Sequence, residues 1–453
     1  MELLVCKFGG SSVATNEKLE HIVKIISLDA RRRCLVLSAP GKAPGHTVKV
    51  TDLLIDMTKK ALKDEDFSTV LTEVKKRFHS IYDPLRLPDE QIDEILTDLD
   101  KRCAAPRDHT GKFRDLIVAA GEDLNCRLFA SYLSSMGIPS QYINPRDAGL
   151  VVTDTFGDAQ PLPESAFNMA NLKSICSDSV IVFPGFFGYT AQGDIATFSR
   201  GGSDLTGSLL AEALDAVEYE NWTDVDGIFS AHPGMVDSPI QIPALTYKEM
   251  RELSYMGFNV LHEEAVKPVM RKKIPIRLRN TANLANTGTL IVTERLPGER
   301  DVIGVASSSG YCSFTLEKFL MNREKGFGRR LLAIFEDLGL SYEHCPSGVD
   351  NISVILDQDQ LKSEIVNSII RTIEDQLQPD VIRSEFGIAL VSVVGEGLIR
   401  KIGFLAKATK ALATSGVNIK MVNQGSSEMS IIFGIDATDE KKAVKALYHE
   451  FFN

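Results

Sequence analysis

Residues 5–12, at the end of the first apolar run of the chain, read Val-Cys-Lys-Phe-Gly-Gly-Ser-Ser. The run predicts a buried strand, and a helical pattern opens near Asn16. Glycines between a strand and a helix point backbone N–H groups outward to bind phosphate, and Lys7 adds a positive charge. The lysine precedes the glycines, so the motif is not a P-loop. Taken alone, it is equally compatible with a purely structural turn.

The composition is that of a globular protein with about two to four domains. Of 453 residues 44% are hydrophobic, and 50 Lys and Arg against 61 Asp and Glu give a net charge of −11. This acidic balance, without a basic stripe, argues against nucleic-acid binding. The cysteines are scattered, which argues against a zinc site or a disulfide framework. The apolar runs are too short for a membrane span, so we expect a cytoplasmic protein.

Residues 1–296 are predicted to form one α/β domain. Strand and helix signals alternate over residues 1–56 and resume at Asp115. This alternation is typical of a mainly parallel sheet covered by helices on both faces. The charged segment 57–115 is helical in pattern, and we expect a helical insertion or lid. Residues 296–301 are expected to form a linker.

The rest of the chain is predicted to form two small units, residues 302–385 and 386–453. Both show the order strand, helix, two strands, helix, as in a ferredoxin-like βαββαβ module. The strands are expected at residues 313–315, 342–345, 352–356, 381–384, 388–394, 418–422 and 429–435. The chain ends just after its last helix, so the second unit lacks a final strand. That strand must come from the first unit or from a neighbour, or an edge stays open.

Four further segments follow a strand or begin a helix. They span residues 37–41, 121–123, 197–204 and 222–227. Ligands of open α/β sheets bind at the carboxyl ends of the strands, so these segments are expected to converge with Lys7. Arg200 offers a planar fork for a carboxylate or phosphate, and Ser203 is expected to cap the following helix. Each residue alone has an ordinary structural explanation, but the combination favours an anion site.

Taken together, these motifs resemble aspartate kinase (aspartokinase), of the amino-acid-kinase family. The resemblance rests on Lys-Phe-Gly-Gly-Ser-Ser (7–12), Arg-Gly-Gly-Ser-Asp (200–204), Thr-Asp-Val-Asp-Gly (223–227) and the two terminal units. It implies a catalytic domain followed by two ACT regulatory units, which the family commonly interleaves. The implied reaction converts ATP and L-aspartate into ADP and 4-phospho-L-aspartate, the first step towards lysine, threonine and methionine.

The resemblance also implies roles for individual residues. The catalytic group is Lys7, Asp204, Gly9, Gly10 and Gly202, in which Asp204 organises the lysine and the glycines are supporting N–H donors. The aspartate site is Ser38, Thr51, Glu122, Arg200 and Ser203, with Arg200 on a carboxylate and Glu122 on the ammonium group. The nucleotide site is Lys7, Gly10, Thr223, Asp224 and Phe229. Mg²⁺ would accompany ATP, although the sequence shows no dedicated ligand set.

The ACT units imply feedback regulation and at least a homodimer. Asn322, Gly326, Phe327 and Gly328 match the positions where the first ACT unit grips an amino-acid effector. Lysine, threonine or both are the effectors that the family implies, and these residues do not distinguish them.

The chain departs from the family pattern in the nucleotide half. Phe229 replaces a tyrosine, His232-Pro233-Gly234 replaces Asp-Pro-Arg, Asn259 replaces a lysine and Glu263 a proline. These changes put individual ATP contacts in doubt. His262 is expected to be a structural histidine. Two alternatives stay open: a kinase for glutamate, carbamate or a nucleotide, and a non-catalytic amino-acid sensor.

Overall fold

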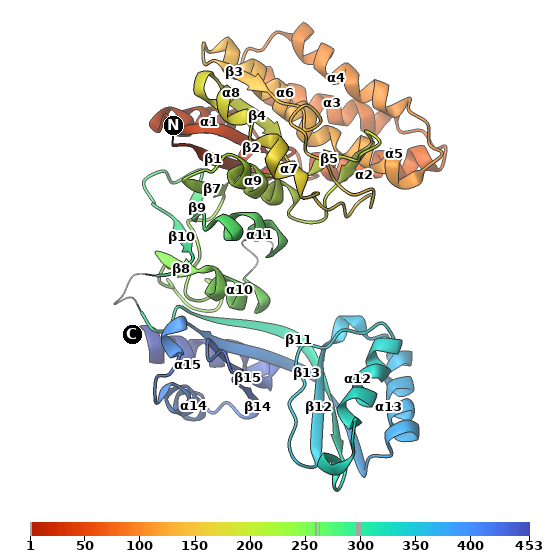
Figure 1. Ribbon diagram of the computed structural model, residues 1–453, viewed down its shortest axis with the longest axis vertical. Coiled ribbons are helices and arrows are strands. Elements are labelled where there is room, and N and C mark those ends of the chain that lie inside the picture. Colours follow the sequence, from red (N-terminus) through yellow and green to blue (C-terminus); the bar gives the residue numbers. More distant parts are fainter. Residues whose placement is uncertain (1, 259–260, 262, 296–299) are drawn as a thin grey trace. The chain divides into compact units, whose positions relative to one another are not determined.

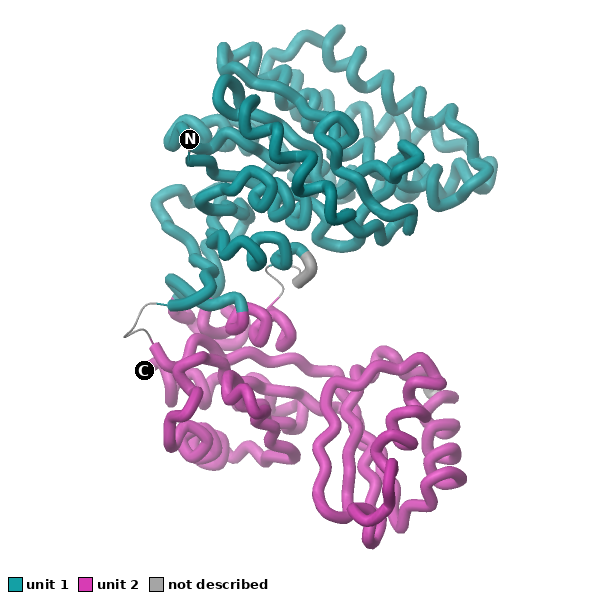
Figure 2. Tube along the Cα trace, in the orientation of Figure 1, with its two compact units in different colours: residues 1–228, 241–247, 259–295 teal, residues 229–240, 248–258, 296–453 magenta. Residues whose placement is uncertain are grey.

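The computed structural model describes residues 2–258, 261, 263–295 and 300–453 (Figure 1). The chain forms two compact units (Figure 2): residues 1–228, 241–247 and 259–295, and residues 229–240, 248–258 and 296–453. Two segments before residue 296 thus belong to the second unit. Asn259, His262 and residues 296–299 of the expected linker lie outside the described residues, as does the side chain of Glu263.

An eight-stranded sheet forms the centre of the first unit. Its order is β3-β4-β2-β1-β7-β9-β10-β8, and all neighbours are parallel except β9 and β10. The strands are β1 (Leu4–Phe8), β2 (Arg32–Leu37), β3 (Ser140–Tyr142), β4 (Val180–Pro184), β7 (Glu218–Thr223), β8 (Ala244–Thr246), β9 (Ile276–Asn280) and β10 (Thr289–Val292). Every residue of β1 and β4 is buried, as expected of strands covered on both faces. The predicted α/β fold is therefore confirmed.

Helices cover this sheet. α6 (Ala120–Ser135) packs against β2, β3 and β4, and α9 (Gly202–Ala213) packs against β1 and β7. The remaining elements are α1 (Asn16–Leu28), α7 (Glu164–Met169), α8 (Leu172–Asp178), α11 (Glu263–Lys272), the 3₁₀ turn η1 (Gly10–Val13) and the hairpin strands β5 (Phe187–Tyr189) and β6 (Ile195–Thr197). α1 and η1 begin directly after β1, so the chain reverses at Gly9 and Gly10.

Further helices form the region of the expected insertion. They are α2 (Val50–Leu62), α3 (Ser68–Tyr82), α4 (Asp89–Cys103) and α5 (Thr110–Val118). In α3, Val70, Val74, Phe78 and Ile81 recur every three or four residues and are buried in the core of the first unit. This spacing gives an apolar stripe that docks the helix.

The second unit contains a five-stranded antiparallel sheet in the order β12-β11-β13-β15-β14 (Figure 1). Its strands are β11 (Gly304–Glu317), β12 (Asn351–Asp357), β13 (Val381–Val394), β14 (Ile419–Asn423) and β15 (Ser430–Asp436). Its helices are α10 (Tyr247–Tyr255), of which residues 248–255 belong to this unit, α12 (Phe327–Asp337), α13 (Ser363–Leu377), α14 (Phe404–Thr414) and α15 (Glu440–Phe452). Residues 304–309 of β11 pair with residues 389–394 of β13, on the side of β13 away from β15. They supply the strand that segment 386–453 lacks.

The structure differs from two of the strand predictions in this unit. Segments 381–384 and 388–394 are strands as predicted, but they belong to one strand, because β11 pairs with both segments across a bulge at Gly387, whose φ is 72°. Residues 342–345 make one isolated bridge, from His344 to Ile355. The following Pro346 has no N–H with which to continue a ladder.

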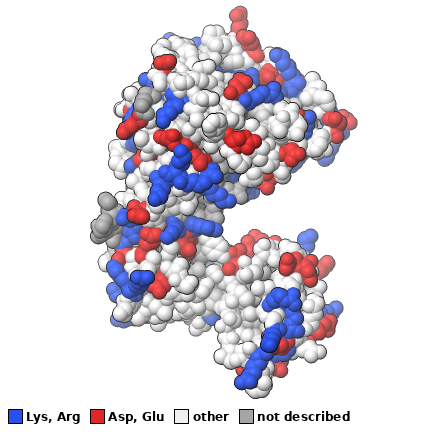
Figure 3. All heavy atoms as spheres, viewed as in Figure 1, with Lys and Arg blue, Asp and Glu red and all other residues white. Residues whose placement is uncertain are grey.

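The surface carries both signs of charge on the visible face of each unit (Figure 3). Among the helices that the structure describes, none has both the length and the apolar character that a bilayer crossing requires.

Candidate active site

A cavity of about 640 Å³ opens in the first unit at the carboxyl ends of the central strands. Gly10 follows β1, Ser38 follows β2 and Asp224 follows β7, and all three line it. The full lining is Gly10, Ser11, Lys18, Ser38, Ala39, Pro40, Gly41, Lys42, Lys49, Thr51, Glu122 and Asp224. Parallel strands therefore bring together five predicted residues from distant parts of the chain.

Lys7 and Asp204 form an ion pair beside this cavity. Lys7 Nζ lies 2.5 Å from Oδ1 of Asp204, and the two side chains are 11% and 14% exposed. Asn221 Nδ2 donates to the same oxygen at 2.8 Å. Lys7 and Asn221 are register partners on β1 and β7, and Asp204 lies in the first turn of α9. The ammonium group is thus held by a charge and kept close to the glycine turn, as a phosphoryl-binding cation requires.

The glycine turn is packed against the loop that follows β2. Gly41 N–H donates to Gly10 O at 2.8 Å. A Cβ on Gly10 would lie 2.9 Å from Ala39 O, and one on Gly41 would lie 2.8 Å from Gly10 O, so both positions exclude a side chain. The N–H of Gly9 donates to Trp222 O at 3.1 Å. In this structure it is therefore not free to act as the phosphate donor expected of it.

The segment around Arg200 begins α9. Gly201, with φ of 78°, is the N-cap, so the helix starts at Gly202 and Ser203 lies inside it. The expected N-cap role of Ser203 was wrong, because the left-handed conformation that starts the helix falls on a glycine. Ser203 is buried against Gly185, whereas Arg200 is exposed. No hydrogen bond or ion pair of Arg200 to another described residue is present.

Glu122 brings a buried carboxyl group to the cavity wall. It lies in the first turn of α6, its exposed fraction is 5%, and Oε2 has no hydrogen-bond partner among the described residues. Burial raises the pKa of Glu122 to about 8, although hydrogen bonds from the backbone of Ala39 and Glu122 itself oppose the shift. A buried carboxyl group that faces a cavity with one oxygen unpartnered suits a ligand with a cationic donor.

Three lysines on the cavity wall were not among the predicted site residues. Lys18 Nζ donates to Ser11 O at 2.6 Å, and Lys42 and Lys49 extend from the loop after β2. Lysines in polar loops are usually solvated, so their convergence was visible only in three dimensions. Only Glu122 and Asp224 contribute acidic groups to the lining, and the cavity therefore suits an anion.

The other predicted residues are more scattered. Thr223 ends β7, and its hydroxyl donates to Asp224 at 3.3 Å. Phe229 is half-buried and belongs to the second unit. Among the expected effector residues, Asn322 is exposed in a short 3₁₀ turn, Phe327 is buried, and Gly326 caps α12 directly before Phe327 and Gly328.

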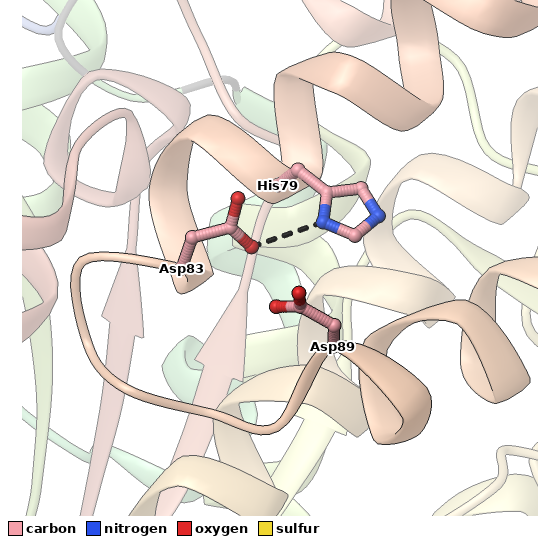
Figure 4. A group of neighbouring side chains, drawn as sticks. All are labelled: His79, Asp83 and Asp89. Carbon is pink, nitrogen blue, oxygen red and sulfur yellow. Dashed lines mark hydrogen bonds and ion pairs between the residues drawn. The ribbon is translucent and has the colours of Figure 1, made fainter.

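A cluster of possible metal ligands lies in the helical region, formed by His79, Asp83 and Asp89 (Figure 4). His79 Nδ1 is 2.9 Å from Asp83 Oδ1, and Nε2 is 3.1 Å from Asp93 Oδ1. Both ring nitrogens therefore already have carboxylate partners, and we interpret the cluster as a surface ion-pair network. None of its members lines the cavity.

The chain is similar to known proteins over nearly its whole length. Residues 2–280 match the amino acid kinase family, and residues 391–451 match an ACT domain. Aspartokinase 3 of Bacillus subtilis is 45% identical over 448 residues, covering 99% of this chain and 98% of the relative. The crystal structure of Clostridium acetobutylicum aspartate kinase is 37% identical with a TM-score of 0.89, covering 99% and 100% of the chains. Escherichia coli aspartokinase III, solved with aspartate and ADP, is 25% identical with a TM-score of 0.76 and full coverage of both chains.

Proposed function

This chain belongs to the aspartokinases of the amino acid kinase family, and we propose that it transfers the γ-phosphoryl group of ATP to the side-chain carboxylate of L-aspartate. The observation that carries this proposal is the cavity. It combines the unpaired carboxyl group of Glu122 with the Lys7–Asp204 pair beside a glycine turn. An amino acid needs a carboxylate for its ammonium group, and a phosphoryl group needs a fixed cation.

The chemistry requires positioning and charge stabilisation. The attacking carboxylate is ionised at neutral pH, so no strong general base is needed. Lys7 would stabilise the transferring phosphoryl group, with Asp204 and Asn221 holding the ammonium in place. Gly10 and Gly202 stay proposed N–H donors, and Ser38, Thr51 and Ser203 stay proposed aspartate contacts.

The nucleotide would lie against the residues that follow β7. Thr223 and Asp224 are proposed to contact it, and Phe229 remains a proposed contact. Mg²⁺, when bound to the phosphates of ATP, would screen their charge. Asp224 fits it best, because it is an exposed carboxylate on the cavity wall and hard cations prefer oxygen ligands.

The direct test measures ADP release from Mg²⁺–ATP with L-aspartate, in the presence of hydroxylamine to trap the acyl phosphate. We expect the aspartyl hydroxamate to form in step with ADP. Turnover with glutamate but not aspartate would assign the chain to another amino-acid kinase. Binding of an amino acid without turnover of any carboxylate would favour a sensor.

Arg200→Ala is expected to raise the KM for aspartate roughly tenfold to a hundredfold and to change kcat less, because a carboxylate clamp contributes a charge-assisted bidentate contact. The matched control is Arg271→Ala, which removes an exposed arginine paired with Glu212 at 2.9 Å. Steady-state kinetics of both variants would check this. An unchanged aspartate dependence in Arg200→Ala would show that another residue holds the carboxylate.

Regulation is proposed to act through the second unit. E. coli aspartokinase III has also been solved with lysine and aspartate, at 25% identity and a TM-score of 0.78. We propose lysine as the effector, bound near Asn322, Gly326, Phe327 and Gly328, with 302–385 and 386–453 as interleaved ACT units. A homo-oligomer of at least two chains, in the cytoplasm, completes the proposal.

A further inference from the structure

Arg77 is a buried cation without an acidic partner among the described residues. It lies on α3 of the helical region and is 3% exposed. Arg32 and Arg102, the other arginines found buried in the described parts of the chain, bind carboxylates: Arg32 pairs with Glu220 at 2.8 Å and Arg102 with Asp98 at 2.7 Å. A buried charge normally requires such a partner, so Arg77 needs another explanation.

The guanidinium group of Arg77 binds carbonyl oxygens of two loops at the cavity. Nη2 donates to Ala14 O and, at 3.4 Å, to Gly41 O, and Nη1 donates to Ser80 Oγ at 3.1 Å. Nε has no partner among the described residues. Ala14 ends the turn that contains Gly10, and Gly41 is on the cavity wall.

One side chain therefore fastens both loops of the anion site to the helical region. The loops are already joined by the bond from Gly41 N–H to Gly10 O. Arg77 adds hydrogen bonds to Ala14 O and Gly41 O in these two loops, and no acidic side chain among the described residues pairs with its charge. Such a charge next to a phosphate-binding turn favours a bound anion, in the same way that oriented amides do.

We propose that Arg77 is a positioning residue for phosphoryl transfer. It holds the loops at Gly10 and Gly41 in the geometry that receives the triphosphate, and the bound phosphates balance its charge. This inference rests on the proposed function. It gives the helical region a role in catalysis although Arg77 touches neither substrate.

The test compares Arg77→Met and Arg77→Lys with the wild type, by hydroxamate kinetics and by the rise in Tm that Mg²⁺–ADP produces. The methionine variant is expected to lower kcat about tenfold to a hundredfold, raise the KM for ATP and reduce the ADP-dependent rise in Tm. The KM for aspartate should change less. Arg77→Lys keeps the positive charge but has fewer N–H donors. Its kcat and its KM for ATP should therefore lie between those of Arg77→Met and those of the wild type.

The matched control is Arg107→Met in the same helical region. Arg107 Nη1 binds Ala61 O at 2.6 Å and Asp64 at 3.1 Å. This variant is expected to lower Tm and leave kcat and both KM values within twofold of wild type. A folded Arg77→Met enzyme with kcat and KM for ATP within twofold of wild type would overturn the proposal. If Arg77→Met does not fold, wild-type kinetics in Arg77→Lys would overturn it equally.

The design separates this inference from the proposed function. A wild-type chain that yields no hydroxamate would overturn the function, and the ADP-dependent Tm shift would still report on Arg77. Normal wild-type turnover with no effect at Arg77 would overturn the inference alone.

Discussion

Replacing Lys7 with alanine is expected to lower kcat by about three orders of magnitude or more while the protein stays folded. The charge on Lys7 is needed mainly in the transition state, where negative charge spreads over the transferring phosphoryl group. The 2.5 Å ion pair with Asp204 fixes the ammonium group before substrate arrives, so the wild-type enzyme spends little energy on reorganisation. Hydroxamate formation at saturating ATP and aspartate measures the effect.

Folding should survive this change, because Asp204 keeps its hydrogen bond from Asn221 and is itself 14% exposed. Circular dichroism and thermal unfolding of Lys7→Ala would check the fold. The matched control is Lys272→Ala, which breaks another 2.5 Å ion pair, between Lys272 and Asp215, whose side chains are 48% and 62% exposed. Its activity should stay within twofold of wild type. A near-normal rate in Lys7→Ala would contradict the assignment of the site.

Several of the loops that line the cavity were predicted from the sequence to converge. Gly10, Ser38 and Asp224 each follow an apolar run, and strands of a parallel sheet end at one edge. The alternation of strands and helices thus predicted which loops meet. What the residues on those loops bind stays a prediction.

Other features depend on contacts that the sequence does not encode locally. Lys42 and Lys49 lie in an ordinary polar loop, and Arg77 looks like one more charged residue on an amphipathic helix. Gly9 follows the phosphate-binding pattern, yet Trp222 O, more than two hundred residues later in the chain, occupies its N–H. Each outcome is decided by tertiary packing, so no local pattern could have predicted it.

The interleaved second unit illustrates the same limit. The missing strand of segment 386–453 was predicted from the order of its elements. Its source, residues 304–309, was not identified, because this short segment contains three serines and gives a weak strand signal. Pairing of β11 with β13 on both sides of the bulge at Gly310 and Gly387 settles the choice, since it satisfies backbone groups of both strands.

The KM for aspartate is expected to fall about tenfold for each pH unit between pH 6 and 7.5, and to level off above pH 8. Burial raises the pKa of Glu122 to about 8, so at pH 7 the carboxyl group of Glu122 is protonated in most of the free enzyme. The ammonium group of aspartate binds the carboxylate form, and binding therefore releases a proton. The KM for ATP over the same pH range is the internal control.

The same pKa shift predicts that the free energy of unfolding falls as the pH rises, whereas aspartate binding becomes stronger. The pKa of Glu122 is raised above its usual value of 4.5. The stability associated with the protonated form is therefore complete below about pH 4.5 and is lost as the pH rises through about 8. The loss is on the order of 5 kcal/mol at 1.36 kcal/mol per unit. Glu122→Gln cannot ionise, and a buried amide left unsatisfied costs less, about 1–3 kcal/mol. This variant should therefore have a higher Tm than wild type at pH 8.5.

Glu122→Gln should also raise the KM for aspartate at least about a hundredfold at pH 8, because the charge that holds the ammonium group is gone. Glu212→Gln is the matched control, since Glu212 is a buried carboxylate that already pairs with Arg271. It should lower Tm and leave the KM for aspartate unchanged. A pH-independent KM in the wild type, or wild-type aspartate binding by Glu122→Gln, would remove Glu122 from the site. Glu122→Gln should thus gain stability and lose aspartate binding, whereas Glu212→Gln should lose stability only. This difference separates a carboxyl group that binds a ligand from one that stabilises the fold.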